Sequence, residues 1–406
     1  MKHVIVGAGA AGISAAKTIR EKRGDDEIVL ISTDDAVHSR CMLHKFISGA
    51  RSEKELSFIP DEFFEDRNIT WLPGTTVTGI DTKNKRVQYN GGLESYDRLL
   101  IATGSENLIP PIGGLRDASN VLGLRNLSDA KAIRKLAADA GSIVIIGAGL
   151  VGLDATWALV EMGKKPVLVE MADTILAQNL DARAASTYKA KFEEAGCVFH
   201  IGRKVTDTVI NESGAVTALL LDDGKSLPCD LVIVAAGVRP AVGFLENSGI
   251  ACARSVTVDG RLATNLEGVY AAGDVAGLSG IWPNAVKQGE VAAMNMCGEE
   301  TEYDDPFAIK NTVNFFGVVT LSVGQLVPTE GDEVLSREDR NRYERVIMRD
   351  GAPVGLILQG NISHSGIWQY LVKNKISLAA KPKPVWNLSF ANFYGVEPNG
   401  EYKWVL

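Results

Sequence analysis

The distribution of apolar residues along this chain predicts parallel strands that alternate with helices. Two short apolar runs, Val4–Val6 and Ile143–Ile146, each lead into a glycine-rich turn and then into a helix-like stretch. A second apolar run follows each of these stretches, at Glu27–Ile31 and at Pro166–Glu170. Continuous apolar strands of this length, separated by helical segments, are typical of βαβ units in a parallel sheet. The sequence therefore predicts two α/β units of the doubly wound kind.

Further apolar runs extend both units. The strand-like segments Tyr96–Gly104 and Asp230–Gly237 each end in a turn of small residues, and Val269–Asp274 ends in an acid. This repetition is expected of two related halves. After about residue 305 the pattern changes to that of a small mixed α/β region, with strands predicted at Val313–Val319 and Val354–Gln359.

The two glycine-rich turns have the G-x-G-x-x-G spacing of dinucleotide-binding loops. Their glycines are Gly7, Gly9 and Gly12 in the first loop and Gly147, Gly149 and Gly152 in the second. The first glycine makes the tight turn, the second lets the backbone approach a pyrophosphate, and the third lets the helix pack closely on the strand. The helix N-terminus offers amide N–H groups and the positive end of its dipole to the phosphates. Two such loops with correct flanking segments predict that two dinucleotides bind, a flavin beside a nicotinamide.

The bulk properties exclude several other classes of protein. With 406 residues, 46% apolar and 23% charged, the chain has a globular composition and room for several domains. Its net charge of −8 argues against nonspecific binding to nucleic acid or to anionic membranes. No apolar run approaches the roughly 20 residues that span a bilayer, and the apolar start is consumed by a strand and its turn, which argues against a signal peptide. The five cysteines show no metal-ligand spacing, so we expect no metal site and reduced thiols in the cytoplasm.

Several short motifs in a fixed order carry a resemblance to a known family. Besides the two glycine loops, they are Ala102–Gly104, Ala236–Pro240, Thr264–Asp274 and Trp282–Ala285. In these motifs the chain resembles the FAD- and NAD(P)-dependent pyridine nucleotide-disulfide oxidoreductases over roughly residues 1–380. Within them it is similar to rubredoxin reductases, putidaredoxin-type ferredoxin reductases and the flavin part of NADH nitrite reductases.

The resemblance implies an order of domains. An FAD-binding domain, residues 1–110 and 241–305, is expected to be split around an NAD-binding domain, residues 111–240. Both domains are expected to be Rossmann-like. Residues 306–406 would form a small mixed α/β domain for docking of the electron acceptor, with an aromatic tail.

For FAD, the resemblance places the first glycine loop at the pyrophosphate and Asp274 at the ribityl or phosphate region. A helix that begins near Trp282 would aim the positive end of its dipole at the flavin ring. Many relatives have a glutamate for the ribose hydroxyls at the end of the second strand, but here that position is Ser32. The residues expected to contact FAD are Gly7, Gly9, Gly12, Ser32, Arg40, Lys45, Val77, Thr103, Gly104, Arg125, Asp274 and Trp282.

For the nicotinamide cofactor, the informative residue is Glu170, at the end of the strand that follows the second loop. A carboxylate at this place accepts hydrogen bonds from the ribose hydroxyls and repels a 2′-phosphate. No arginine follows it directly, so NADH is favoured over NADPH. The residues expected to bind NAD are Gly147, Gly149, Gly152, Glu170 and Gly237.

The segment from Arg40 to Lys45 has two interpretations. As R-x-x-L-x-K it is similar to the motif of putidaredoxin-type reductases, in which the lysine lies near flavin N5 and pairs with an acid in the second loop's helix. Here that acid is Asp154, one methylene shorter than the usual glutamate. As C-x-L-x-x-x-I-x-G the segment resembles coenzyme A-disulfide reductases and NADH oxidases, which work through a single cysteine. Cys41 beside a flavin and Lys45 would then have a lowered pKa, or it is simply a small apolar filler.

Two features of the last hundred residues bear on partners. Five arginines between positions 337 and 349 form either a solvated face or a docking patch for an acidic electron carrier. The aromatic tail that begins at Lys381 either folds back on its own domain or is buried in a partner subunit.

These observations favour an FAD-dependent NADH oxidoreductase that passes electrons to or from an iron or iron–sulfur protein. The partner would be rubredoxin, ferredoxin or an iron–sulfur subunit of a larger complex. Lys45 and Asp154 would tune the flavin. The alternative is a disulfide, persulfide or oxygen/peroxide reductase that depends on Cys41.

Overall fold

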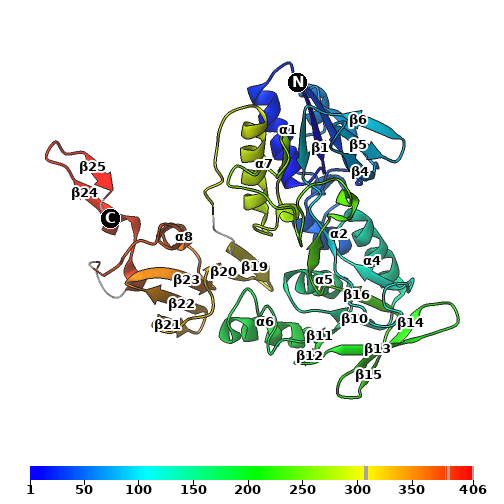
Figure 1. The fold of residues 1–406 in the computed structure, drawn as a ribbon. Helices are drawn as coiled ribbons and strands as arrows, with labels where there is room; N and C mark the ends of the chain where they lie inside the picture. The colour runs from blue at the N-terminus through cyan, green and yellow to red at the C-terminus, as the bar shows by residue number, and fades with distance from the viewer. Residues whose placement is uncertain (306–309, 380, 382–384, 405–406) are drawn as a thin grey trace. The chain divides into compact units, whose positions relative to one another are not determined.

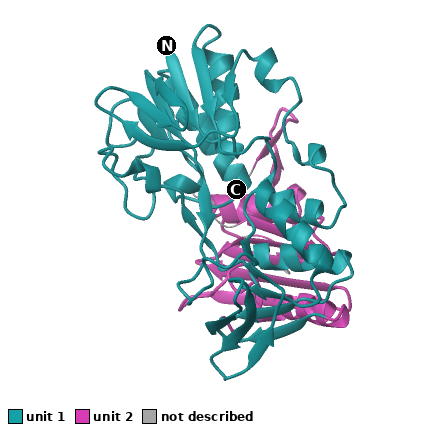
Figure 2. Ribbon diagram, turned by 90° about the vertical axis from the view of Figure 1, so that its right-hand side faces the viewer, with its two compact units in different colours: residues 1–171, 197–308 teal, residues 172–196, 309–406 magenta. Residues whose placement is uncertain are grey.

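The structure is a computed structural model that describes residues 1–305, 310–379, 381 and 385–404. It has two compact units (Figure 2): unit 1 comprises residues 1–171 and 197–308, and unit 2 comprises residues 172–196 and 309–406. Residues 306–309, where the predicted last domain begins, lie outside the described residues.

The first parallel sheet of unit 1 has the strand order β18-β7-β1-β2-β3. Its strands are β1 (Lys2–Val6), β2 (Glu27–Ile31), β3 (Thr70–Leu72), β7 (Arg98–Ile101) and β18 (Val269–Ala271). Helices α1 (Ala10–Lys22) and α7 (Trp282–Met296) lie side by side on one face (Figure 1). An antiparallel sheet of β4 (Val77–Asp81), β5 (Arg86–Tyr89) and β6 (Gly92–Ser95) packs against the other face. Because both faces are covered, residues Val4–Val6 of β1, Ile28–Ile31 of β2 and Leu99–Ile101 of β7 are all apolar and buried, as the sequence pattern predicted.

The second parallel sheet of unit 1 has the order β12-β11-β10-β16-β9. Its strands are β9 (Val121–Gly123), β10 (Ile143–Ile146), β11 (Val167–Glu170), β12 (Val198–Ile201) and β16 (Leu231–Val234). Its helices are α4 (Leu127–Asp139) and α5 (Leu150–Glu161). A flanking antiparallel sheet consists of β13 (Val205–Ile210), β14 (Val216–Leu221) and β15 (Ser226–Pro228). The strands β8 (Ser105–Asn107) and β17 (Val238–Pro240) form an antiparallel pair. The chain passes through β8 on its way from the first parallel sheet to the second, and through β17 on its way back.

These two sheets confirm the predicted fold class. Strand β18 follows the whole second sheet in sequence, yet it pairs in parallel with β7 of the first sheet. The first nucleotide-binding fold is therefore split around the second. The exact domain limits given above stay predictions.

Short elements complete unit 1. They are α2 (Leu43–Ile47), α3 (Phe63–Asp66) and the 3-10 turns η1 (Arg40–Met42), η2 (Lys54–Leu56), η3 (Gly243–Leu245) and η4 (Asp274–Ala276).

Unit 2 is built on an antiparallel sheet of order β19-β20-β23-β22-β21. The strands are β19 (Lys310–Phe315), β20 (Val318–Gly324), β21 (Glu333–Asp339), β22 (Arg342–Arg349) and β23 (Ala352–Gln359), with helix α8 (Ser365–Asn374). The single strand predicted at Val313–Val319 is wrong. Phe316 and Gly317, at φ 53° and 75°, form a turn that splits it into the hairpin β19–β20. A left-handed turn of this kind matches the twist of paired strands.

Helix α6 (Ala182–Glu194) belongs to unit 2, although it stands in the sequence between strands of the second parallel sheet. The hydroxyl of Tyr188 on α6 lies 2.7 Å from Thr320 Oγ1, and Gln359 Nε2 donates to the Ala184 carbonyl at 3.0 Å. These buried contacts make α6 part of the core of this unit, which the sequence pattern did not indicate.

The arginine run is largely neutralised inside unit 2. Arg342 pairs with Asp339 at 2.8 Å, Arg349 with Asp332 at 2.8 Å and Arg345 with Asp181 at 3.3 Å. Arg337 pairs with Glu344 and lies over the ring of Trp386. Most of this positive charge is therefore used for internal ion pairs, which weakens the predicted docking patch.

The aromatic tail begins by packing on its own unit and ends as an exposed hairpin. Pro382 and Pro384 lie outside the described residues. After them come the turns η5 (Val385–Asn387) and η6 (Phe390–Phe393), and the hairpin of β24 (Tyr394–Val396) and β25 (Tyr402–Trp404). Phe393 is fully buried, with Trp404 stacked on it at 5.6 Å. Tyr394 and Tyr402 are 51% and 77% exposed.

Among the described residues, no helix has both the length and the apolar character needed to cross a membrane.

Candidate functional site

The first glycine loop lies between β1 and α1, and its geometry explains its glycines. Gly7 has φ +115°, and a Cβ there would lie 2.2 Å from the Ala102 carbonyl oxygen. A Cβ on Gly12 would lie 1.9 Å from the Gly7 oxygen, so Gly12 lets α1 pack on the loop. Gly9, directly before α1, leaves room for a ligand beside the helix N-terminus, and a Cβ on Gly9 would lie 3.3 Å from Arg40 Nη1.

A cavity of about 460 Å³ opens above this loop. The cavity is lined by all the residues predicted to bind FAD except Gly12, which packs helix on strand, and Lys45. Its volume falls within the range of roughly 300–1,000 Å³ that ligand pockets have. A glycine cradle at a helix N-terminus, with arginines on its walls, provides what a dinucleotide needs. The residues present therefore fit FAD.

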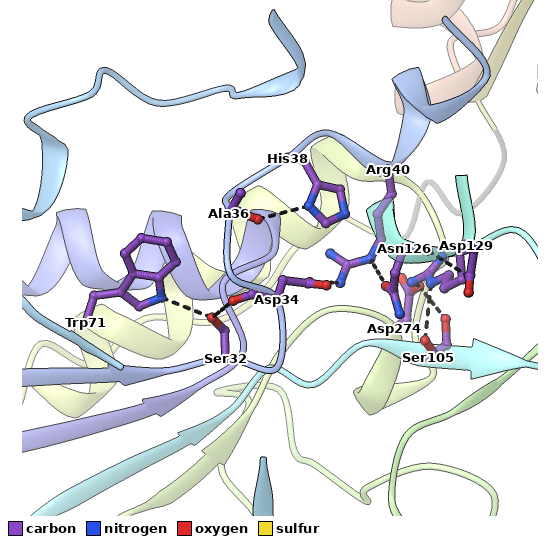
Figure 3. Close-up of polar contacts among 11 residues, drawn as sticks. Ser32, Asp34, Ala36, His38, Arg40, Trp71, Ser105, Asn126, Asp129 and Asp274 are labelled. Atoms are coloured by element: carbon purple, nitrogen blue, oxygen red, sulfur yellow. Dashed lines mark hydrogen bonds and ion pairs between the residues drawn. The ribbon is translucent and has the colours of Figure 1, made fainter. Parts of the chain in front are cut away.

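Charged side chains that line the cavity contact one another (Figure 3). Arg40 Nη2 pairs with Asp34 Oδ2 at 2.9 Å, and Arg40 Nε donates to Asn126 Oδ1 at 3.3 Å. Arg125 pairs with Asp274 at 2.6 Å, and Ser105 Oγ donates to the same carboxylate at 3.0 Å. Burial lowers the pKa of the Arg40 guanidinium, and Asp34 opposes this shift. These contacts hold the two arginines in fixed positions before a ligand arrives.

The Ser32 hydroxyl is already hydrogen-bonded to neighbouring residues. It is 4% exposed, accepts a hydrogen bond from Trp71 Nε1 at 3.0 Å, and donates to the Asp34 carbonyl at 2.8 Å. The carboxylate of Asp34, two positions further along, also lines the cavity. Asp34 was missed in the sequence, and so was Asn126. The sequence did contain a signal for Asp34. It is an acid two residues after Ser32, the strand-end position where many relatives have a glutamate, and Arg40 follows it.

The second glycine loop repeats the backbone of the first. Gly147 has φ +104°, and a Cβ there would lie 2.4 Å from the Ala235 oxygen. A Cβ on Gly152 would lie 2.1 Å from the Gly147 oxygen, whereas one on Gly149 would meet nothing within 4 Å. Glu170 Oε2 accepts a hydrogen bond from the Ala148 amide at 2.7 Å, so the predicted ribose-binding carboxylate does face this loop. Gly237 follows the end of β16 with φ +107°.

The predicted contact of Lys45 with Asp154 is a longer-range electrostatic one, through which Lys45 lowers the pKa of that carboxyl, and no direct ion pair joins the two among the described residues. Lys45 Nζ lies 3.5 Å from Glu161 Oε1, and it is His44 Nδ1 that lies 3.8 Å from Asp154 Oδ2. The lysine side chain is long enough to run over the ring of Trp157, at 5.9 Å, toward the C-terminal end of α5. The short Asp154 side chain meets the neighbouring residue of α2 instead.

Cys41 lines the cavity, but the expectation of a lowered pKa is wrong. Desolvation raises the pKa of the Cys41 thiol, and the nearby Asp154 raises it further. Because a thiol with a raised pKa forms little thiolate at neutral pH, it is a weak nucleophile in this state.

Comparison with known proteins adds to this geometry. Residues 1–289 match the family described as pyridine nucleotide-disulphide oxidoreductase, and residues 310–376 match the rubredoxin NAD+ reductase C-terminal domain. The chain belongs to the pyridine nucleotide-disulphide oxidoreductase family. It is an FAD-dependent NAD(P)H oxidoreductase.

Individual members of the family are similar over most of the chain. The NADH-dependent phenylglyoxylate dehydrogenase subunit epsilon of Aromatoleum evansii is 31% identical, over 93% of this chain and 92% of its own. An NADH oxidase of Methanocaldococcus jannaschii is 32% identical, over 75% of this chain and 71% of its own. Among solved structures, the ferredoxin reductase for the CYP199A2 system of Rhodopseudomonas palustris is 26% identical with a TM-score of 0.83, covering 93% of this chain and 95% of that one.

Proposed function

We propose that this protein transfers electrons between NADH and an iron or iron–sulfur protein through a bound FAD. The observation that carries the proposal is the charged cavity above the first glycine loop, in a chain whose C-terminal part is of the rubredoxin-reductase type. FAD supplies the chemistry, since it accepts a hydride and releases its electrons one at a time.

The residues of the cavity divide the work of holding FAD. Amides at Gly9 and at the start of α1 would bind the pyrophosphate, and Arg40 would neutralise its charge. Asp34 is placed to take the role of the missing strand-end glutamate. Arg125 and Asp274 would orient the part of the cofactor between pyrophosphate and ring. In domain terms, residues 1–110 and 241–305 would bind FAD.

The second loop is suited to a nicotinamide dinucleotide that binds and dissociates in each turnover. Glu170 would exchange its hydrogen bond with the Ala148 amide for bonds to the ribose hydroxyls. Its negative charge would repel a 2′-phosphate, so NADH is the proposed substrate. The NAD-binding domain would be residues 111–240, with Gly147, Gly149, Gly152 and Gly237 near the cofactor.

The partner would dock on the remaining domain, residues 306–406. The exposed side chains of Tyr394 and Tyr402 favour a surface that a protein partner covers, because aromatic residues are enriched in interface cores. One relative is a subunit of a larger dehydrogenase, so an iron–sulfur subunit of a complex is as suitable a partner as free rubredoxin or ferredoxin. The five cysteines are all unpaired thiols, which supports a location in the cytoplasm.

The test is anaerobic reduction of the FAD-loaded protein. NADH should bleach the flavin, NADPH should do so far more slowly, and oxidised rubredoxin or ferredoxin should restore the colour. Deleting residues 385–406 should leave FAD bound and slow only the step with the protein acceptor. Flavin that NADH reduces but that no iron protein reoxidises would contradict the proposal.

A second function is favoured by the place of Cys41 on the cavity wall. A thiol there could serve a disulfide, persulfide or peroxide reductase, and one relative is an NADH oxidase. Its raised pKa speaks against this role. An anaerobic dithionite titration separates the two. Uptake of two electrons per FAD would leave Cys41 a bystander, whereas about four electrons, with a charge-transfer band lost in Cys41→Ser, would make it a redox centre.

A further inference from the structure

A seam of titratable side chains lies between α2 and α5, next to the cavity. Helix α5 presents Asp154, Trp157 and Glu161 at intervals of three and four residues, which places them on one face. From the other side, His44 and Lys45 of α2 meet this face. Cys41, in the 3-10 turn just before α2, joins the seam to the cavity.

Along this seam the direct contacts differ from the predicted pair of Lys45 with Asp154. Lys45 Nζ lies 3.5 Å from Glu161 Oε1, so the direct ion pair of this lysine is with Glu161. Asp154 is left with His44, a side chain that can be neutral, at 3.8 Å. His44 is 14% exposed and Asp154 34% exposed, so the pair borders solvent without being surrounded by it.

Burial sets the charge of the pair. It raises the pKa of Asp154 to about 7, with Lys45 acting in the opposite direction. It lowers the pKa of His44 to about 4, and Lys45 adds to that shift. Near pH 7 the His44 imidazole is therefore uncharged, and the proton that exchanges in this pair is the carboxyl proton of Asp154.

Other groups around the seam bear on this proton. The charged and titratable neighbours are Cys41 before α2, Lys45 on α2, Arg51 in the loop after α2, Glu161 on α5 and Arg134 on α4, which donates to the Phe46 carbonyl. Of these, Lys45 and Glu161 neutralise one another.

The proposed electron transfer needs a place for one proton. NADH delivers a hydride, which is one proton with two electrons. Two oxidised iron centres then take one electron each, so one proton remains and must pass to a base on the protein. Lys45 is engaged with Glu161, and desolvation raises the pKa of the Cys41 thiol. In the seam beside the cavity, the carboxyl of Asp154 is a group whose pKa lies near neutrality.

We propose that Asp154 and His44 together form the proton-exchanging pair of this reductase. Asp154 accepts the proton left when the electrons depart singly, and its carboxylate becomes a carboxylic acid. His44 orients that carboxyl and connects it with solvent at the edge of the seam. Lys45 then serves to hold α2 against α5 and does not exchange the proton. This assignment rests on the proposed function.

The test uses the FAD-loaded protein and two readouts. Infrared difference spectra between about pH 5 and 9 should show a carboxylic acid band that titrates near neutrality. The band should vanish in Asp154→Asn and persist in Glu161→Gln, a matched control on the same face of α5. Ferricyanide, a one-electron iron acceptor, should reoxidise the NADH-reduced protein at a rate that depends on pH. A plot of this rate against pH should change slope, at a break near the same pH. Asp154→Asn should slow reoxidation about tenfold and remove the break, and His44→Gln should shift the break.

The two readouts keep this inference separable from the function. A band that survives in Asp154→Asn, or a pH break that Glu161→Gln removes and Asp154→Asn keeps, overturns the assignment. Protein that passes no electrons to ferricyanide contradicts the proposed electron transfer alone, because the infrared band reports on the pair whether or not electrons flow.

Discussion

The two glycine loops have nearly the same backbone and very different surroundings. A Cβ on the first glycine would lie 2.2 Å from a carbonyl oxygen in one loop and 2.4 Å in the other, and a Cβ on the third 1.9 and 2.1 Å. The surroundings of the two loops differ at the middle glycine. A Cβ on Gly9 would lie 3.3 Å from Arg40 Nη1, whereas a Cβ on Gly149 would meet nothing within 4 Å among the described residues. The glycines thus set the turn, and the side chains around them decide what binds and how firmly.

The strand-end residues show the same contrast. In the second loop the strand-end carboxylate, Glu170, reaches the Ala148 amide directly. In the first loop the strand-end residue is a buried serine, and the carboxylate of Asp34 is tied to Arg40. A walled site with fixed charges suits a cofactor that stays bound. An open loop with one carboxylate suits a substrate that must leave after each turnover.

The largest expected effect comes from the turn glycines themselves. Gly7→Ala places a Cβ against the Ala102 oxygen at a positive φ, so the protein should lose nearly all bound FAD, or fail to fold. Gly147→Ala should instead keep FAD and lose reduction by NADH. Flavin absorbance after purification and stopped-flow reduction measure the two. Equal flavin loss in both variants would remove the distinction between the loops.

Removing the wall of the first site should have a smaller effect. Arg40→Ala removes a charge-assisted contact worth about 1.5–3 kcal/mol, so FAD should bind about 10- to 100-fold more weakly. Asp34→Asn, which keeps the shape, should have a milder effect in the same direction. Titration of flavin-free protein with FAD gives the affinities. The KM for NADH should stay unchanged, and a rise in that KM with normal FAD binding would contradict this assignment.

At the open site the carboxylate should set the choice of nicotinamide. Glu170→Ser removes the charge that repels a 2′-phosphate, so the ratio of kcat/KM for NADH over NADPH should fall about tenfold or more. Asp173→Ser, a nearby acid in the following loop, serves as the control. An unchanged ratio in Glu170→Ser would show that NADH preference resides elsewhere.

The smallest effect concerns stability and pH. The pKa of Asp154 is raised from 3.8 to about 7, so between these values the folded protein keeps a proton that the unfolded chain has released. The stability contribution of Asp154 must therefore fall as pH rises through that window. Asp154→Asn should gain melting temperature relative to the wild-type protein at about pH 8, and gain less at about pH 5. A parallel offset at both values would contradict the raised pKa.

Much of this protein could be predicted because its signals are local. The strand–turn–helix units, the two glycine loops and Glu170 all depend on residues close in sequence, and the structure keeps these elements. The prediction failed where side chains far apart in sequence compete for partners. Lys45 had two acids within reach on α5, Asp154 and Glu161, and only packing of the two helices decided between them. The pKa of Cys41 failed for the same reason, because burial outweighed the expected effect of a nearby cation.

Motifs along the chain were enough to predict the two nucleotide-binding folds, the split of the first around the second, and the family. Periodic burial and glycine conformation are properties of short segments, so they can be read along the chain. Only the tertiary structure assigned Asp34 and Asn126 to the cavity, paired four of the five arginines between positions 337 and 349 with acids, and placed His44 beside Asp154. Ion pairing and desolvation depend on distances between segments that folding brings together. These distances cannot be predicted from any single segment of the sequence.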